Sequence, residues 1–225
     1  MRLNVMPTIA HITKKMIQDR PFIHEALEKG LVNFGALAEF MRPQIELELE
    51  QKVKISTISM AIRRYLEKKN KSLRKIHISK KTDLLAKSNL FEISLSRNAS
   101  LHKILSQMYQ IVDFNVGDTL NIIYGNYEVL IISNDKYKKK ILNLLKNEIL
   151  LEVKDDLSSV SIKIPEDCLY TPGFYFAITK LLLMENISII DIVNTKTEAT
   201  FLLFDKDIPR AYSALKNGIE LGYYK

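Results

Sequence analysis

The side chains able to do chemistry are few in this chain, and their spacing does not form a catalytic or metal-binding set. The four histidines are His11, His24, His77 and His102. No pair of them has the His-x3-His spacing and there is no cysteine pair, so no zinc site is expected. The sequence also lacks a GxGxxG motif and a Walker-type glycine loop. It therefore predicts a protein that is not an enzyme, with no catalytic residue, metal or cofactor.

A basic helix is the main candidate for binding a large partner. Ile58, Ile62 and Tyr65 recur at helical spacing and predict its buried face. The pattern S-T-x-S-x-A-x-R-R over residues 56–64 is similar to the recognition helices of bacterial and archaeal repressors. Hydroxyls at a helix N-terminus can bond phosphates or base edges, and arginines can bind phosphate or guanine. The DNA-binding candidates are Lys54, Ser56, Thr57, Ser59, Arg63 and Arg64.

Positive charge is concentrated in the same part of the chain. Residues 1–88 hold 18 Lys or Arg against 9 Asp or Glu, whereas residues 89–225 hold 15 against 17. The net charge of +7 therefore belongs to the first part. This asymmetry indicates a polyanion-binding module joined to a near-neutral one. A solvated basic surface would give the same counts.

Residues 1–75 predict a helical domain that resembles a helix-turn-helix, with residues 76–89 as a basic linker or a wing. Pro43 predicts a kink or a break in the helix that Asn33 caps. The connection from Glu46 to Lys54 is longer than a strict helix-turn-helix turn, and much of it can continue the helix. A small helical bundle used for dimerisation or for docking on another protein explains the pattern equally well.

The compartment is predicted from cysteine usage and from the absence of apolar segments. Cys168 is the one cysteine, so no disulfide can form within the chain, which fits a reducing cytoplasm. No apolar run reaches the roughly 18–20 residues of a membrane span. The first residues lack the apolar core of a signal peptide. We therefore expect a cytoplasmic protein.

Residues 90–225 contain two rounds of one strand and helix pattern. The alternating segment Phe91–Leu95 corresponds to Val160–Ile164, 69 residues later. Residues 90–155 and 156–225 are each expected to form one βαββαβ domain. Gly125-Asn126 predicts a tight hairpin turn with positive φ at both residues.

The second round resembles the ACT domain, a small regulatory βαββαβ fold. The resemblance rests on a strand that ends near Pro165, on Pro172-Gly173 at a helix start, and on the junction at residues 184–189, where Asn-Ile-x-Ile follows the helix. The first round is more divergent, with Asn98-Ala99-Ser100 in place of Thr171-Pro172-Gly173. The predicted class is α+β: an N-terminal all-α, helix-turn-helix-like domain followed by two ferredoxin-like ACT domains.

The ACT resemblance implies a small-molecule effector, often an amino acid, bound at an interface between two domains. In the family, backbone N–H groups at a helix N-terminus suit the effector's carboxylate. Carried over onto this sequence, the ligand-binding candidates are Leu169, Tyr170, Thr171, Pro172, Gly173, Phe174, Asn186, Ile187 and Ile189. Many ACT-like domains bind no ligand and serve as dimerisation units, so that alternative stays open.

Two functions are consistent with this organisation. The first is an amino-acid-responsive transcription regulator of amino acid metabolism, in which the effector changes the spacing of two DNA-binding domains. The second is a regulatory subunit that docks on a metabolic enzyme through the helical domain and confers allosteric feedback. A homodimer is expected in both cases.

Overall fold

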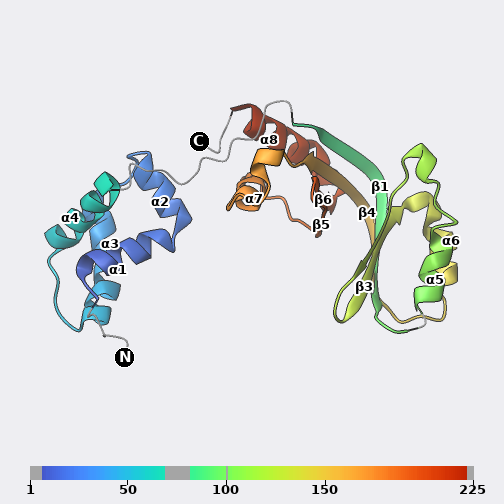
Figure 1. The fold of residues 1–225 in the computed structure, drawn as a ribbon, viewed down its shortest axis with the longest axis horizontal. Helices are drawn as coiled ribbons and strands as arrows, with labels where there is room; N and C mark the ends of the chain where they lie inside the picture. The colour runs from blue at the N-terminus through green and yellow to red at the C-terminus, as the bar shows by residue number, and fades with distance from the viewer. Residues whose placement is uncertain (1–6, 69–81, 100, 222–225) are drawn as a thin grey trace. The chain divides into compact units, whose positions relative to one another are not determined.

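The computed structural model describes residues 7–68, 82–99 and 101–221 of the chain. The chain divides into two compact units, Met1–Arg74 and Lys75–Lys225, and each is described by itself (Figure 1). Ser100 and residues 76–81 of the predicted linker or wing lie outside the described residues.

The described part of the first unit is built from four helices. They are α1 (Ile9–Gln18), α2 (Pro21–Glu28), α3 (Phe34–Leu49) and α4 (Ile55–Lys68). The Asn33 side chain accepts the N–H groups of Gly35 and Ala36, which fixes the start of α3. Apolar side chains at helical spacing meet in one core, which includes Ile12, Met16, Ile17, Leu37, Met41, Ile45, Ile58 and Ile62.

The connection between α3 and α4 is shorter than the sequence indicates. A kink or a break is predicted at Pro43. Helix α3 continues past Pro43, so the break does not occur. The helix takes in much of the predicted connection and leaves residues 50–54 between α3 and α4. The Glu46 carboxylate accepts the Val53 N–H at 2.9 Å and a Lys52 ammonium hydrogen at 3.3 Å. The Val53 bond, followed by Lys52, lowers the pKa of Glu46, so the ionised carboxylate fixes this turn.

The second unit is one antiparallel sheet with helices on one face. Its strands are β1 (Leu84–Ser96), β2 (Leu120–Tyr124), β3 (Glu128–Asn134), β4 (Leu150–Lys163), β5 (Asp191–Asn194) and β6 (Glu198–Phe204), in the order β2-β3-β1-β4-β6-β5. Its helices are α5 (Leu101–Met108), α6 (Lys138–Leu144), α7 (Phe174–Met184) and α8 (Ile208–Leu221). Single 3-10 turns lie at Phe114–Val116, Asp135–Tyr137, Glu166–Cys168 and Asp205–Asp207. Figure 1 shows α7 and α8 at one end of the curled sheet and α5 and α6 at the other.

Two long strands, β1 and β4, join two βαββαβ lobes. Lobe 1 uses residues 90–96 of β1 and residues 150–154 of β4, with α5, β2, β3 and α6 between them. Lobe 2 uses residues 157–163 of β4, then α7, β5, β6 and α8, and its fourth strand is residues 84–87 of β1. The strand that completes lobe 2 therefore precedes lobe 1 in the sequence. Residues 84–89, expected as part of a linker or wing, lie within β1.

Both long strands shift register where they pass from one lobe to the other. Asn89 in β1 has φ of 57° and Asp156 in β4 has φ of 54°, and each lies next to a member of the Leu90–Leu157 pair. Asn and Asp occupy the left-handed region more readily than most residues. The boundary predicted between residues 155 and 156 is thus a kink within one continuous strand.

Each lobe has its own core between the sheet and its helices. Phe91, Ile93 and Ile131 pack against α5 and α6 in lobe 1, and Val160, Ile162 and Phe201 pack against α7 and α8 in lobe 2. A smaller cluster lies on the opposite face, which we call the helix-free face. It joins Leu90 and Ile132 of lobe 1 to Leu157 and Leu202 of lobe 2. The sheet therefore curls so that the two lobes meet on this face.

Candidate functional site

The loop before α7, together with the first residue of that helix, contains six of the nine predicted effector residues. Gly173 has φ of 92° and Tyr170 has φ of 58°, and the Tyr170 side chain is 90% exposed. The Thr171 N–H donates to the Cys168 carbonyl and the Thr171 hydroxyl to the Asp167 carbonyl, both at 3.1 Å. The first N–H groups of a helix have no acceptor within the helix. At the start of α7 the Phe174 N–H donates to the Thr171 carbonyl at 3.3 Å, and the partial positive charge of the helix N-terminus on the next N–H groups suits a carboxylate.

The nine predicted effector residues differ in exposure. The exposed ones are Tyr170, Pro172, Gly173 and Asn186. Thr171 is half-buried. Those in or against the lobe 2 core are Leu169, Phe174, Ile187 and Ile189. Because the side chains of Phe174 and Ile187 are buried, any contact from these two residues to an effector would come from the backbone.

Helix α7 separates the predicted residues into two groups. Residues 169–174 lie at its start, and residues 186–189 follow its end at Met184. A helix of 11 residues is about 16 Å long at roughly 1.5 Å per residue. One amino acid cannot reach both groups within a single chain. A site that uses both groups therefore needs the loop of one copy and the junction of another.

The described residues hold no group of three or more His, Cys, Asp or Glu that could bind a metal ion. Cys168, next to the loop before α7, is 4% exposed. Burial, with a smaller effect from Asp167, raises the pKa of its thiol, which keeps it protonated and a poor nucleophile. Within the same described residues, no helix has both the length and the apolar character to cross a membrane.

The face of α4 predicted to bind DNA is exposed in large part. The exposed candidates are Lys54, Ser56, Thr57, Arg63 and Arg64. Ser59 is half-buried, and its hydroxyl donates to the Phe34 carbonyl of α3 at 3.4 Å. Met60, which is 50% exposed, and Glu67 also lie at the surface of α4. The surface is thus mixed in character, and DNA binding by α4 stays a prediction.

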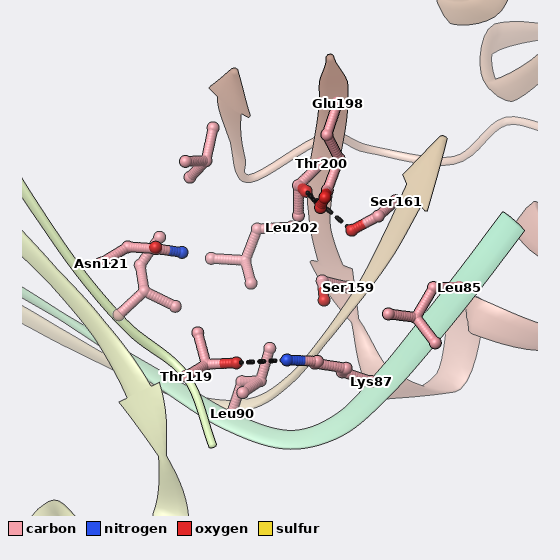
Figure 2. A pocket seen from close by; sticks show the side chains of 12 residues that line it. Leu85, Lys87, Leu90, Thr119, Asn121, Ser159, Ser161, Glu198, Thr200 and Leu202 are labelled. Carbon is pink, nitrogen blue, oxygen red and sulfur yellow. Dashed lines mark hydrogen bonds between the residues drawn. The ribbon is translucent and has the colours of Figure 1, made fainter. Parts of the chain in front are cut away.

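A cavity of about 200 Å³ lies on the helix-free face of the sheet (Figure 2). All six strands contribute to its lining. Its aliphatic residues are Leu85, Leu90, Ile132, Val193 and Leu202. Its polar residues are Lys87, Thr119, Asn121, Ser159, Ser161, Glu198 and Thr200. Its lining brings residues of both lobes to one place.

The two charged groups of the cavity are held by hydrogen bonds. The Lys87 ammonium donates to the Gly117 carbonyl at 2.9 Å and to the Thr119 hydroxyl at 3.2 Å. The Thr200 hydroxyl donates to the Glu198 carboxylate at 2.8 Å, and the Ser161 hydroxyl lies 2.7 Å from that of Thr200. Figure 2 shows the two groups on different sides of the cavity, with Leu202 between them. The Lys87 ammonium and the Glu198 carboxylate therefore lie on different sides of the cavity, and the aliphatic side chain of Leu202 lies between them.

The sequence did not lead us to the cavity residues. Lys87 lay in the predicted linker, and Ser159 and Ser161 read as the solvent face of a half-buried strand. Both serines are less than 10% exposed, because the sheet curls over them. The alternation Leu85-x-Lys87 was the available signal, but the side chains opposite it depend on strand pairing, which the sequence does not reveal.

A buried carboxyl group also lies on the helix-free face. Glu92 is 1% exposed, and the Lys154 ammonium donates to it at 2.9 Å while contacting Glu152 at 2.8 Å. Burial, followed by a contact with the Asp191 carboxyl group, raises the pKa of Glu92 to about 7, although Lys154 opposes this. Glu92 belongs to lobe 1 and Asp191 to lobe 2, so this carboxyl pair is a second contact between the lobes.

Comparison by sequence finds no match, either among protein-family models or among curated proteins. Comparison by structure finds aspartate kinases. The kinase of Clostridium acetobutylicum is 19% identical over 67% of this chain and 37% of its own, with a TM-score of 0.52. The kinase of Synechocystis is 11% identical over 73% of this chain and 32% of its own, with a TM-score of 0.52.

A third structure, of aspartokinase alpha and beta subunits, is 16% identical over 62% of this chain and 98% of its own, with a TM-score of 0.50. The chain thus spans about a third of the length of the two kinases above (37% and 32%). At these identities the likeness concerns the fold. The chain therefore shares a fold with part of these aspartate kinase structures.

Proposed function

We propose that the chain is a regulatory protein rather than an enzyme. It binds an amino acid effector at its ACT-type lobes and docks on a partner protein through its helical unit. The observation that carries the proposal is the loop before α7, which offers the first-turn amides of a helix beside the left-handed Gly173. The structural neighbours support it, since the clostridial kinase is described as an allosteric enzyme.

The effector site in this proposal is completed by a second copy of the chain. The two groups of effector residues lie at opposite ends of α7, so each copy gives its loop to one site and its junction to the other. A two-fold dimer has two such sites. An effector bound there favours one arrangement of the dimer over others, and this difference in affinity is what regulates the partner.

Apolar side chains on the helical unit support docking on a protein. Phe40 and Leu47 of α3 are 63% and 79% exposed, and they lie two helical turns apart on one face. Leu31, just before α3, is 75% exposed. Large apolar groups gathered at a surface are typical of protein interaction sites. We therefore assign docking to the face of α3 that carries Phe40 and Leu47.

A Gly173→Val variant tests the effector loop. A β-branched residue is strongly disfavoured at φ of 92°, so the loop should rearrange and lose its amide geometry. The measurement is the thermal midpoint of the full chain with each of the twenty amino acids. We expect the wild type to be stabilised by one or a few of them, by about 2.7 kcal/mol at 100 times Kd, and the variant to lose the shift caused by at least one of them.

Gly30→Val is the matched control. Gly30 also has a positive φ, 68°, but it lies in the helical unit, where an added Cβ would meet nothing within 4 Å. The control should lower the midpoint through backbone strain and keep the effector shift. A wild-type chain that responds to none of the twenty amino acids would contradict effector binding.

A second candidate function is DNA binding, favoured by the exposed Arg63 and Arg64 of α4. The double variant Arg63→Ala/Arg64→Ala should then weaken binding to DNA and reduce the salt dependence by about one unit of slope for each phosphate that is no longer neutralised. The double variant Lys14→Ala/Lys15→Ala removes the same charge from exposed positions of α1 and should have a smaller effect. If the wild-type chain does not bind DNA even at low salt, DNA binding is ruled out and docking on a protein remains.

A further inference from the structure

We propose that the cavity on the helix-free face binds a free aliphatic α-amino acid, at a site distinct from the α7 loop. The ligand's carboxylate would lie at Lys87, its ammonium at Glu198, and its side chain on the aliphatic floor. All these groups come from one chain. The site therefore does not depend on a second copy, unlike the effector site at α7.

The charges of the cavity favour a zwitterion. Lys87 is the cation and Glu198 the anion among its twelve lining residues, and they lie on different sides of the hollow (Figure 2). A lysine ammonium has three donors, and two of them are directed to Gly117 and Thr119. The ammonium also helps Lys136 and Tyr137 to lower the pKa of the nearby Asp118 carboxyl group. The third donor can bond a ligand carboxylate, since no hydrogen bond from it to another described residue is seen. A ligand with only one charge would satisfy one side and desolvate the other without compensation.

The hydroxyl groups position the anion before any ligand arrives. The Thr200 hydroxyl gives its hydrogen to Glu198, and the Ser161 hydroxyl therefore donates to Thr200. Ser161 is only 8% exposed, so this hydrogen-bonded chain begins inside the sheet. A carboxylate oriented in this way loses little conformational freedom when an ammonium group binds to it.

The size and walls of the cavity set the class of side chain. About 200 Å³ corresponds to six or seven water molecules at roughly 30 Å³ each, and it is smaller than the roughly 300–1,000 Å³ of drug-sized pockets. Leu85, Val193 and Leu202 are among its aliphatic lining residues, and Leu202 lies between the charged groups (Figure 2). These features fit a branched aliphatic amino acid such as valine, leucine or isoleucine.

Such a ligand would hold the two lobes together. Asn121 and Ile132 belong to lobe 1, whereas Ser161, Glu198 and Thr200 belong to lobe 2. Lys87 lies in the part of β1 that completes lobe 2, yet it bonds Thr119 at the start of β2. Binding should therefore favour the curled form of the sheet and oppose separation of the lobes on this face.

The test is calorimetric titration of the full chain with L-leucine, L-isoleucine and L-valine in turn. We expect at least one of them to bind. L-leucinamide, which lacks the carboxylate, and 4-methylpentanoate, which lacks the ammonium, should bind at least tenfold more weakly than L-leucine. Lys87→Met and Glu198→Gln should each weaken binding of the amino acid at least tenfold. Both variants should still unfold in one cooperative thermal transition without ligand, since neither side chain is in a core. Lys87→Met also loses the bonds to Gly117 and Thr119, so its midpoint should fall more than that of Glu198→Gln.

Gly173→Val separates this proposal from the effector loop. We expect that variant to retain the binding that Lys87→Met and Glu198→Gln lose. The opposite result is that Gly173→Val abolishes binding and both cavity variants retain it. This result would assign the ligand to the α7 loop and overturn the cavity site, while the proposed function stands. The cavity site would also be overturned if none of the three amino acids produced heat in the titration and equilibrium dialysis likewise detected no binding.

Discussion

Replacing Glu92 by Gln should remove a fall in stability that we expect of the wild-type protein as the pH rises from about 4.5 to 7. Burial and Asp191 raise the pKa of Glu92 from 4.5 to about 7. The stabilisation is therefore complete below pH 4.5 and is lost as the pH rises through 7. Two to three pKa units correspond to about 3 kcal/mol in the free energy of unfolding. Gln has the same shape and does not ionise, so urea titrations at several pH values should give a flatter profile.

Glu152→Gln is the control for this pH dependence. Its carboxylate contacts the same Lys154 ammonium at 2.8 Å, but its side chain is 57% exposed. It should leave the slope between pH 4.5 and 7 close to that of the wild type, because an exposed ion pair contributes little. An equal slope in the wild type and in Glu92→Gln would mean that the Glu92 carboxyl group does not titrate between these lobes as described.

A fragment that begins at Leu90 should be much less stable than one that begins at Lys75. Cutting at residue 90, the start of the first predicted ACT domain, removes the strand that completes lobe 2. Four residue pairs between β1 and β4 are removed, from Leu84–Ile162 to Lys87–Ser159, at about 1 kcal/mol for each hydrogen bond. Leu84 also packs against the lobe 2 core. A loss of about 4–5 kcal/mol is a large share of the total stability of roughly 5–15 kcal/mol.

The measurement is urea unfolding of both fragments, with gel filtration to detect association. The shorter fragment exposes one edge of β4, and an unpaired edge favours aggregation. The longer fragment keeps the strand and lacks only the helical unit, so it controls for truncation itself. Equal unfolding midpoints would show that residues 84–87 contribute nothing to lobe 2.

Local patterns in the sequence were sufficient to identify most elements of the sheet unit. Leu120–Tyr124, before the Gly125-Asn126 turn, is predicted as a strand and forms β2, and the apolar spacing from Leu101 to Met108 predicts α5. These patterns are informative because the period of a helix or strand decides which side chains face the core, and neighbouring residues are enough to show that period. Gly125-Asn126 was a partial success. The residues do join β2 to β3, but neither has a positive φ, because Tyr127 is also part of the connection.

Strand order could not be predicted in the same way. Nothing near residues 84–87 indicates that they pair with residues 159–162, more than seventy positions later. The repeat in the sequence suggested two consecutive domains, whereas β1 and β4 each serve both lobes. Pairing between distant segments is set by global packing, so the cavity and the Glu92–Asp191 contact could not be predicted either.

The effector candidates were identified from a resemblance, and the structure changes how they can act. The resemblance assigns residues 169–174 and 186–189 to one site. They lie at the two ends of α7, and the helix keeps them about 16 Å apart. Burial of Phe174 and Ile187 limits these two residues to backbone contacts. What remains is an exposed loop and an exposed junction that need two copies of the chain to meet.

Mixing two inactive variants is the most direct test of this two-copy site. Gly173→Val alters the loop and Asn186→Ala alters the junction, so homodimers of either variant should show no shift of the thermal midpoint with the effector amino acid. Random exchange gives mixed dimers in which one of two sites has both halves intact, so about a quarter of all sites should recover. Every chain would carry Lys87→Met to remove the cavity's contribution. Recovered binding in the mixture is the predicted result, and a mixture as inactive as its parents would contradict it.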